Sequence, residues 1–241
     1  MTRLRRPTSL VACLLAILIG GWLAMAAVPV PAQDASPTVG PASTERIAAE
    51  LVSMTASATP GSTLILAVRQ DIEPGWHTYW RNPGDSGGAT TLDWRLPDGL
   101  EAGEIVWPLP ERQPLSGLMN YGYSDVVYLP VPITVPADAG PGRMLDLSVT
   151  ALFLVCSAEM CVPDELTLGL RLPVGAADQT PLETRHATAI QAVLESSPRP
   201  AGLAARVASA DDGSLILAIT GEAVQGPEGP GPVYFLSLIH I

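Results

Sequence analysis

The stretch VCSAEMCVP, residues 155–163, carries two cysteines, Cys156 and Cys161, separated by four residues. Three kinds of chemistry suit such a pair: a structural disulfide, a soft-metal site, or a redox pair that exchanges electrons with another thiol protein. A disulfide across so short a loop removes only about 2 kcal/mol of unfolded-state entropy, which makes it a weak staple. The spacing alone leaves all three interpretations open.

A metal site at this pair would need further ligands. Met160 lies between the cysteines, and His77 or His186 from elsewhere in the chain would suit a soft ion such as Cu(I). The spacing is not one of the usual zinc patterns, and the sequence has no second cysteine pair to complete a tetrahedral site. We therefore expect no bound metal and no cofactor.

The flanking residues predict where the pair lies. The apolar run 152–155 leads directly into Cys156, and Val162-Pro163 follows Cys161, so the pair is expected at a strand end near the rim of the domain. A partner thiolate can reach a sulfur there but not in a core. The negative charge of Glu159, two residues before Cys161, disfavours a thiolate, which indicates a pair that depends on its partner's chemistry.

Two further segments are rich in aromatic residues. In EPGWHTYWRNPGDSGG (73–88), alternating aromatics favour a strand with Trp76 and Trp80 on a core face, followed by a loop that could contact partners. His77 in this segment is interpreted as a hydrogen-bonded side chain instead of a general base. In LMNYGYSDVVYLPVPI (118–133), the Tyr-Gly-Tyr sequence precedes an apolar strand and could fold over the rim.

The N-terminus predicts export. Three arginines precede an uncharged apolar run over residues 10–23, and small residues follow, which is the pattern of a secretory signal peptide. Residues 1–32 are the predicted signal peptide, with an uncleaved anchor or a lipidated Cys13 as weaker alternatives. Export places the chain in an oxidising space, where a nearby cysteine pair rests as a disulfide unless something reduces it.

The charge of the chain excludes two classes of partner. The sequence has 24 acidic residues and 13 basic residues, all of them arginine, and removing residues 1–32 takes away three of the arginines. Nucleic acids and anionic membrane surfaces both favour Lys/Arg clusters, which are absent here. We expect neither as a partner.

Short apolar runs between turn signals predict an all-β body over residues 44–175. The number and spacing of these runs favour an immunoglobulin-like β-sandwich. The expected strands are residues 47–56, 63–70, 91–96, 104–107, 126–135, 144–155 and 165–172.

The pattern changes outside this body. Residues 33–43 are expected to be a linker, and the capping signals of TPLE (180–183) predict a helix that runs to Ser196, within a helical linker at 176–200. A second β pattern over 201–241, with strands expected at 203–208, 214–220 and 233–235, is too short to close a sandwich. We interpret it as the truncated start of a second β domain.

Three segments together resemble a known family. GWHTYWRNPGDSG (75–87), NYGYSDVVYLPVPI (120–133) and LVCSAEMCVP (154–163), in this order and at this separation, resemble the N-terminal periplasmic domain of DsbD-type thiol:disulfide interchange proteins. The ScsB branch, known from copper-sensitivity suppression, is the closer match. The resemblance covers residues 44–175, and the segment after it resembles the start of the second N-terminal module of that branch.

The resemblance implies a redox function in the periplasm. Such a domain receives electrons from a membrane-embedded thiol domain and a thioredoxin-like domain of the same polypeptide, which tether it to the membrane. It then reduces periplasmic partners with a thioredoxin fold, for disulfide correction, cytochrome c maturation or copper tolerance. In the family the second cysteine joins the partner in a mixed disulfide, which implies that Cys161 exchanges and Cys156 resolves.

The resemblance also implies a cap that shields the cysteine pair until a partner arrives. The family's cap loop matches the stretch from Leu118 to Tyr121, with Tyr121 at the position of the family's aromatic. DsbD itself has an acidic pair where this chain has Leu118 and Met119, and its cysteines are spaced differently. The expected cap and partner surface consists of Leu118, Met119, Asn120, Tyr121 and Tyr123.

One alternative from another functional class remains at this point. The chain could be a non-catalytic immunoglobulin-like binding module, for copper or a client protein, in which the disulfide is structural. Reachable and reversible sulfurs at Cys156 and Cys161 would favour the redox interpretation over this one.

Overall fold

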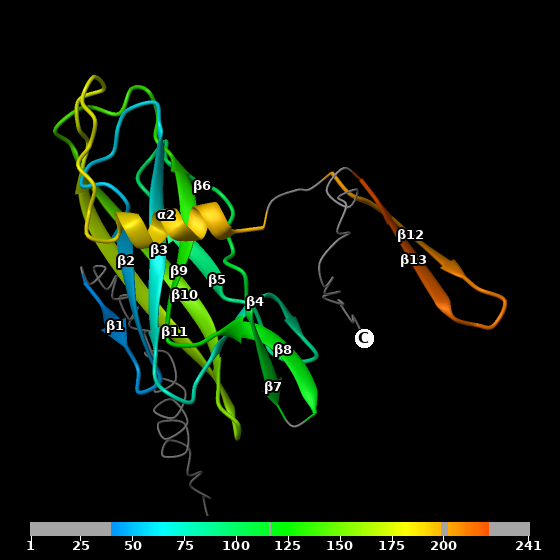
Figure 1. Ribbon diagram of the computed structural model, residues 1–241. Coiled ribbons are helices and arrows are strands. Elements are labelled where there is room, and N and C mark those ends of the chain that lie inside the picture. The colour runs from blue at the N-terminus through cyan, green and yellow to red at the C-terminus, as the bar shows by residue number, and fades with distance from the viewer. Residues whose placement is uncertain (1–39, 116, 199–201, 222–241) are drawn as a thin grey trace, which may run out of the picture. The chain divides into compact units, whose positions relative to one another are not determined.

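The computed structural model describes residues 40–115, 117–198 and 202–221 (Figure 1). The predicted signal peptide, most of the predicted linker at 33–43 and the strand expected at 233–235 lie outside these ranges. Within them, no helix combines the length and the apolar character that a membrane crossing requires.

The described chain is built mainly of strands. One sheet has the order β1-β2-β3-β9-β6, a second has the order β11-β10-β5, and a smaller third has the order β4-β8-β7. The strands of these sheets are β1 (Ala42–Ser43), β2 (Ile47–Ser53), β3 (Thr63–Ile72), β4 (Thr78–Gly84), β5 (Thr91–Arg95), β6 (Glu101–Ala102), β7 (Glu111–Leu115), β8 (Leu118–Tyr123), β9 (Val126–Thr134), β10 (Met144–Cys156) and β11 (Cys161–Pro173).

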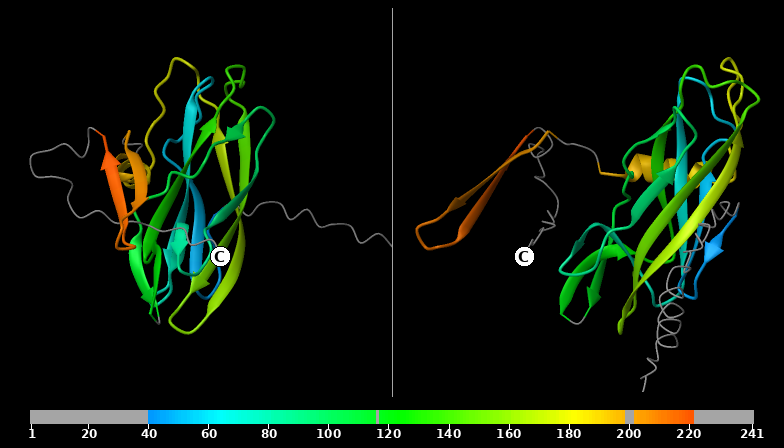
Figure 2. Two further views of the ribbon diagram at one scale, coloured as in Figure 1. Left: turned by 90° about the vertical axis from the view of Figure 1, so that its right-hand side faces the viewer. Right: turned by 180° about the vertical axis from the view of Figure 1, so that it is seen from behind.

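Alternating side chains explain how the first two sheets pack. Strand β10 buries every second residue from Leu145 to Val155, because successive side chains on a strand point to opposite faces. These residues share one core with inward side chains of β3 and β9, among them Leu66 and Leu129. The predicted immunoglobulin-like β-sandwich is confirmed. Its β10–β11 turn and the β7–β8 hairpin lie at the same end of the sandwich (Figure 1, Figure 2).

One expected strand is wrong. Residues 104–107 form no regular ladder, although the backbone N–H groups of Gly103 and Val106 donate to the carbonyls of Pro132 and Pro130 at 2.8 and 2.7 Å. Prolines at both positions of β9 have no N–H to return, so the pairing cannot continue as a regular sheet. Strand β6 takes the edge position instead, at Glu101–Ala102.

The helix α2 (Ala187–Ser196) begins later than its sequence signals indicate. Glu183 forms an isolated β-bridge with Thr55, and the Thr184 hydroxyl donates to the carbonyl of Ser53 at 2.6 Å. In a helix that starts at Thr180 these residues would have helical dihedral angles and could not make this extended pairing. The helix therefore begins after them. The predicted end of the helix, at Ser196, is confirmed.

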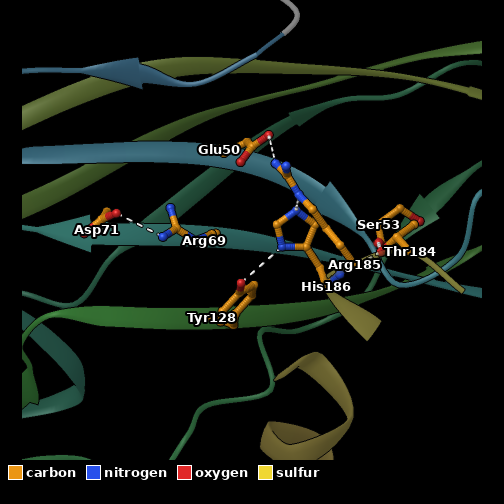
Figure 3. Close-up of polar contacts among 8 residues, drawn as sticks. All are labelled: Glu50, Ser53, Arg69, Asp71, Tyr128, Thr184, Arg185 and His186. Carbon is orange, nitrogen blue, oxygen red and sulfur yellow. Dashed lines mark hydrogen bonds and ion pairs between the residues drawn. The ribbon is translucent and has the colours of Figure 1, made fainter. Parts of the chain in front are cut away.

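The helix packs on the outer face of the β1-β2-β3-β9-β6 sheet. Ile190 is fully buried in a small cluster with Val52 and Ala67. At the start of the helix, His186 Nδ1 lies 3.1 Å from the hydroxyl of Tyr128, and Arg185 Nε donates to His186 Nε2 at 2.9 Å (Figure 3). The Arg185 bond requires an unprotonated Nε2, so His186 is held as the neutral tautomer with its proton on Nδ1.

This arrangement predicts acid sensitivity. Burial, together with the charges of Arg185 and Arg69, lowers the pKa of His186 below its ordinary 6.5, although Glu50 opposes the shift. Because the unfolded chain then binds the proton more readily, protonation favours unfolding. The contribution of His186 to the free energy of unfolding is complete above pH 6.5 and decreases as the pH drops below it. The fall attributable to one histidine is at most about 1.4 kcal/mol per pH unit.

Urea unfolding of the wild type, His186→Asn and the exposed-site control Thr188→Asn, at several pH values between neutral and acid, measures this slope. We expect His186→Asn to flatten it and Thr188→Asn to leave it unchanged. Equal slopes in all three proteins would contradict the role of His186.

A separate hairpin follows the helix. Strands β12 (Ala204–Ser209) and β13 (Leu215–Thr220) pair around a turn that contains Gly213, which confirms the first two strands expected in this segment. Val207, Leu215 and Leu217 on these strands are exposed.

Candidate functional site

The two cysteines form a disulfide at the end of the longest hairpin. Cys156 is the last residue of β10, Cys161 is the first residue of β11, and the two are direct partners in the strand register. Cys156 is 0% exposed, whereas Cys161 is exposed. The pair therefore lies at a strand end, with Cys156 in the protein interior and Cys161 at the surface.

Backbone hydrogen bonds explain why the side chains meet. Cys156 exchanges both of its backbone hydrogen bonds with His77, each at 2.9 Å. Since the N–H and C=O groups of one residue point to the same side of a strand, Cys156 faces Cys161 as a non-hydrogen-bonded pair, the arrangement in which cross-strand side chains are closest. Their Cα atoms are 4.1 Å apart.

A tyrosine and a histidine complete the site. Side chains of residues opposite each other in antiparallel strands project from the same face of the sheet, and so do side chains two positions apart on one strand. His77, Tyr79 and both cysteines therefore share a face. The Tyr79 hydroxyl lies 3.9 Å from Cys161 Sγ and 3.2 Å from His77 Nε2. The rings of His77 and Tyr79 meet edge to face, with centroids 5.1 Å apart.

Burial sets the protonation of these two neighbours. It lowers the pKa of His77 and raises the pKa of Tyr79. At neutral pH the imidazole is therefore neutral and the phenol keeps its proton. After reduction of the disulfide, the Tyr79 hydroxyl is in position to donate a hydrogen bond to a Cys161 thiolate, which would favour the charged form of the sulfur.

An ion pair lies at the end of the sandwich that carries the cysteines. Asp164, three residues after Cys161, accepts hydrogen bonds from the guanidinium of Arg46 and from the hydroxyl of Thr44, at 2.6 to 3.0 Å. Burial opposes ionisation of Asp164, but these bonds outweigh it and keep its pKa lowered. Arg46 also lies 5.7 Å from the ring centroid of Trp76, the residue before His77. One arginine thus joins β11 to the segment that carries His77.

The expected cap residues form strand β8 and not a loop. The strand pairs with β4 on one side, where Gly122 lies opposite Tyr79, and with β7 on the other. Its residues differ in exposure, since Leu118 is exposed, Met119 and Tyr121 are half-buried, and Asn120 and Tyr123 are buried. The Tyr123 hydroxyl donates to the carbonyl of Pro108 at 3.0 Å. The shielding role of these residues stays a prediction.

Sequence reasoning identified the cysteines but missed Tyr79 as their neighbour. Trp76 is half-buried and Trp80 is buried, both against the main core, as expected. Tyr79 has the opposite parity to Trp80 and shares a face with His77, so the same alternation that placed the tryptophans could have paired His77 with Tyr79.

Of the metal ligands considered from the sequence, His77 lies beside the cysteines, but His186 and Met160 do not join it as ligands there. His186 bonds to Tyr128 and Arg185 beside the helix, and Met160 is exposed in the β10–β11 turn. Among the described residues, no three histidine, cysteine or acidic side chains are grouped as metal ligands would be.

Comparison with known proteins decides the family. Residues 45–172, more than half of the chain, match the model of the N-terminal domain of the thiol:disulfide interchange protein DsbD. The chain belongs to the DsbD N-terminal domain family. Family membership identifies this sandwich as a thiol:disulfide interchange module, and it implies redox partners in general. No curated protein matches the chain.

Two solved structures are similar to the chain, and one of them has a TM-score high enough to support its fold. The N-terminal periplasmic domain of ScsB from Proteus mirabilis has a TM-score of 0.52 at 18% identity, over 76% of this chain and 69% of that one. The sixth cohesin of scaffoldin B from Acetivibrio cellulolyticus, solved in complex with a Cel5 dockerin mutant, has a TM-score of 0.27 at 14% identity, over 52% of this chain and 98% of that one. The ScsB domain supports the sandwich architecture.

Proposed function

We propose that this DsbD-type domain is the exchange module of a periplasmic disulfide reductase, with Cys161 as the exchanging sulfur and Cys156 as the resolving one. The observation that carries the proposal is the asymmetry of the pair. Cys161 is exposed and has a hydroxyl at hydrogen-bond distance, whereas Cys156 is buried and fixed by two backbone bonds. A partner can reach the first sulfur and not the second.

The reaction is two successive thiol–disulfide exchanges. The reduced Cys161 thiolate attacks a disulfide sulfur of the partner, forms a mixed disulfide and releases one partner thiolate. Cys156, as a thiolate, then attacks the sulfur of Cys161, which releases the second partner thiolate and restores the Cys156–Cys161 disulfide. Two electrons pass to the partner, which takes up two protons. No cofactor takes part.

The proposed partners come from family membership and export. An exported chain of this family would take electrons from a membrane-embedded thiol domain and a thioredoxin-like domain, and pass them to a periplasmic protein with a thioredoxin fold. Disulfide correction, cytochrome c maturation and copper tolerance are the processes this exchange would serve. In the same proposal, residues 44–175 are the exchange domain, residues 1–32 a signal peptide, and residues 201–241 part of a further β module.

Mixed-disulfide trapping tests the assignment. The reduced Cys156→Ser chain is mixed with a thioredoxin-fold protein whose single active-site cysteine carries a thionitrobenzoate leaving group. We expect Cys161 to displace the chromophore and form a covalent adduct of the two proteins, because the variant lacks the thiol that would resolve it. Released thionitrobenzoate and non-reducing electrophoresis measure the two products.

The reciprocal variant, Cys161→Ser, is the matched control. Its remaining cysteine, Cys156, is buried and poorly accessible to the reagent. We therefore expect it to release the chromophore at least about tenfold more slowly than Cys156→Ser does. Equal adduct formation by both variants would contradict the assignment of roles. Absence of any adduct would favour a binding module with a structural disulfide.

A further inference from the structure

The loop that follows β4 is fastened to the predicted cap strand. Residues 85–88, called the glycine loop here, begin directly after Gly84, the last residue of β4, which pairs with Asn120 of β8. The backbone N–H of Asp85 donates to the carbonyl of Met119 at 3.1 Å, and the N–H of Met119 donates to the Asp85 carboxylate at 2.8 Å. The two segments are therefore joined by reciprocal bonds between the same two residues.

A buried amide makes the second attachment. Asn120 is 0% exposed, and its Oδ1 accepts from both the backbone N–H and the hydroxyl of Ser86, at 3.0 and 3.1 Å. Its Nδ2 has no hydrogen-bond partner among the described residues. Burying the Nδ2 donor without a partner costs free energy. The stabilising contribution of this side chain therefore comes from the two hydrogen bonds that Oδ1 accepts.

The next residue of the loop lies on Tyr79. Gly87 has a φ of 99°, which favours glycine, and a Cβ atom at this position would overlap Cε1 and Cζ of the Tyr79 ring. The glycine backbone thus covers the end of the ring that carries the hydroxyl. Tyr79 is 1% exposed, although its hydroxyl is within reach of the exposed Cys161.

We propose that Asn120 is a positioning residue for exchange at Cys161. It holds Ser86, which places Gly87 on the ring of Tyr79, and the ring in turn holds its hydroxyl against the sulfur. Asn120 acts on the sulfur through this chain of contacts, in addition to any shielding by β8. The inference rests on the proposed function, because it assigns a support for the sulfur that exchanges.

Alkylation of Cys161 by iodoacetamide tests the inference, measured over a range of pH in the reduced Cys156→Ser chain. We expect Asn120→Ala to slow the reaction at pH 7 by about fivefold and to move the rate–pH curve to higher pH, because the hydrogen bond to the thiolate weakens. Ser86→Ala, which removes one of the two donors, is expected to act in the same direction by less. In a Tyr79→Phe background, Asn120→Ala should add no further change.

Gln113→Ala is the matched control. Gln113 pairs with Asn120 across the β7–β8 hairpin, but its amide donates to Ser124 at 2.9 Å and not to the glycine loop. We expect its rate–pH curve to match the Cys156→Ser parent. Faster alkylation of the Asn120→Ala chain in both Tyr79 backgrounds would overturn the inference, since Asn120 would then only shield the sulfur.

An unchanged rate–pH curve for a folded Asn120→Ala or Ser86→Ala chain would also overturn it. The readout uses a small reagent and no partner protein, so it is independent of the trapping experiment. A normal adduct with an unchanged curve rejects the positioning role alone. A shifted curve without an adduct rejects the proposed function alone.

Discussion

Replacing Tyr79 by phenylalanine is expected to slow exchange at Cys161 by about tenfold at pH 7. The substitution keeps the ring that the glycine loop covers and removes only the hydroxyl 3.9 Å from the sulfur. A hydrogen bond to a charged group contributes about 1.5 kcal/mol, and losing it reduces the thiolate fraction accordingly. The rate should recover as the pH is raised, because the thiolate then forms without help.

Stopped-flow measurement of the reaction between the reduced domain and a thionitrobenzoate disulfide, over a range of pH, checks this expectation. Tyr123→Phe is the control, since Tyr123 is also buried but its hydroxyl donates to the carbonyl of Pro108. A Tyr79→Phe curve identical to that of the wild type would show that the hydroxyl contributes nothing to the sulfur.

Replacing Ile190 by alanine is expected to lower the free energy of unfolding by about 3 kcal/mol. Ile190 is fully buried between α2 and the sheet, where it contacts a cluster that contains Val52 and Ala67. The substitution removes apolar contacts and leaves a cavity that a helix held at its start by Thr184 and His186 can close only in part.

Urea unfolding of Ile190→Ala, with Thr188→Ala as an exposed control on the same helix, measures the difference. We expect the control to remain within about 0.5 kcal/mol of the wild type. A small effect at Ile190 would mean that α2 is a linker, as its sequence suggested, and contributes little to the stability of the sandwich.

Local patterns in the sequence were sufficient to predict the β-sandwich and the position of the cysteine pair at a strand end. An apolar run between turn signals predicted β10, and the cysteines at the end of that run predicted a strand end. Both features depend on residues close together in the chain. The β7–β8 pairing and the true start of α2 depend on distant partners, such as Thr55 for Glu183, which no local signal reveals.

The contacts around Cys161 were the least predictable part of the site. Tyr79 reaches the sulfur because His77 pairs with Cys156, a contact across 79 positions of sequence. The support from Asn120 depends on a loop that crosses back over the ring. The expectation that this loop contacts partners stays a prediction, and no local signal revealed that its backbone is fastened to β8.

The register of the β10–β11 hairpin has a consequence for the reduced protein. Cys156 and Cys161 are the final rung of a ladder that pairs every residue of two thirteen-residue strands. When the sulfur–sulfur bond is broken, the remaining rungs keep the two thiols at a high effective concentration. The disulfide therefore re-forms with almost no conformational search, so in the proposed exchange we expect a mixed disulfide on Cys161 to be short-lived and the partner to be released rapidly.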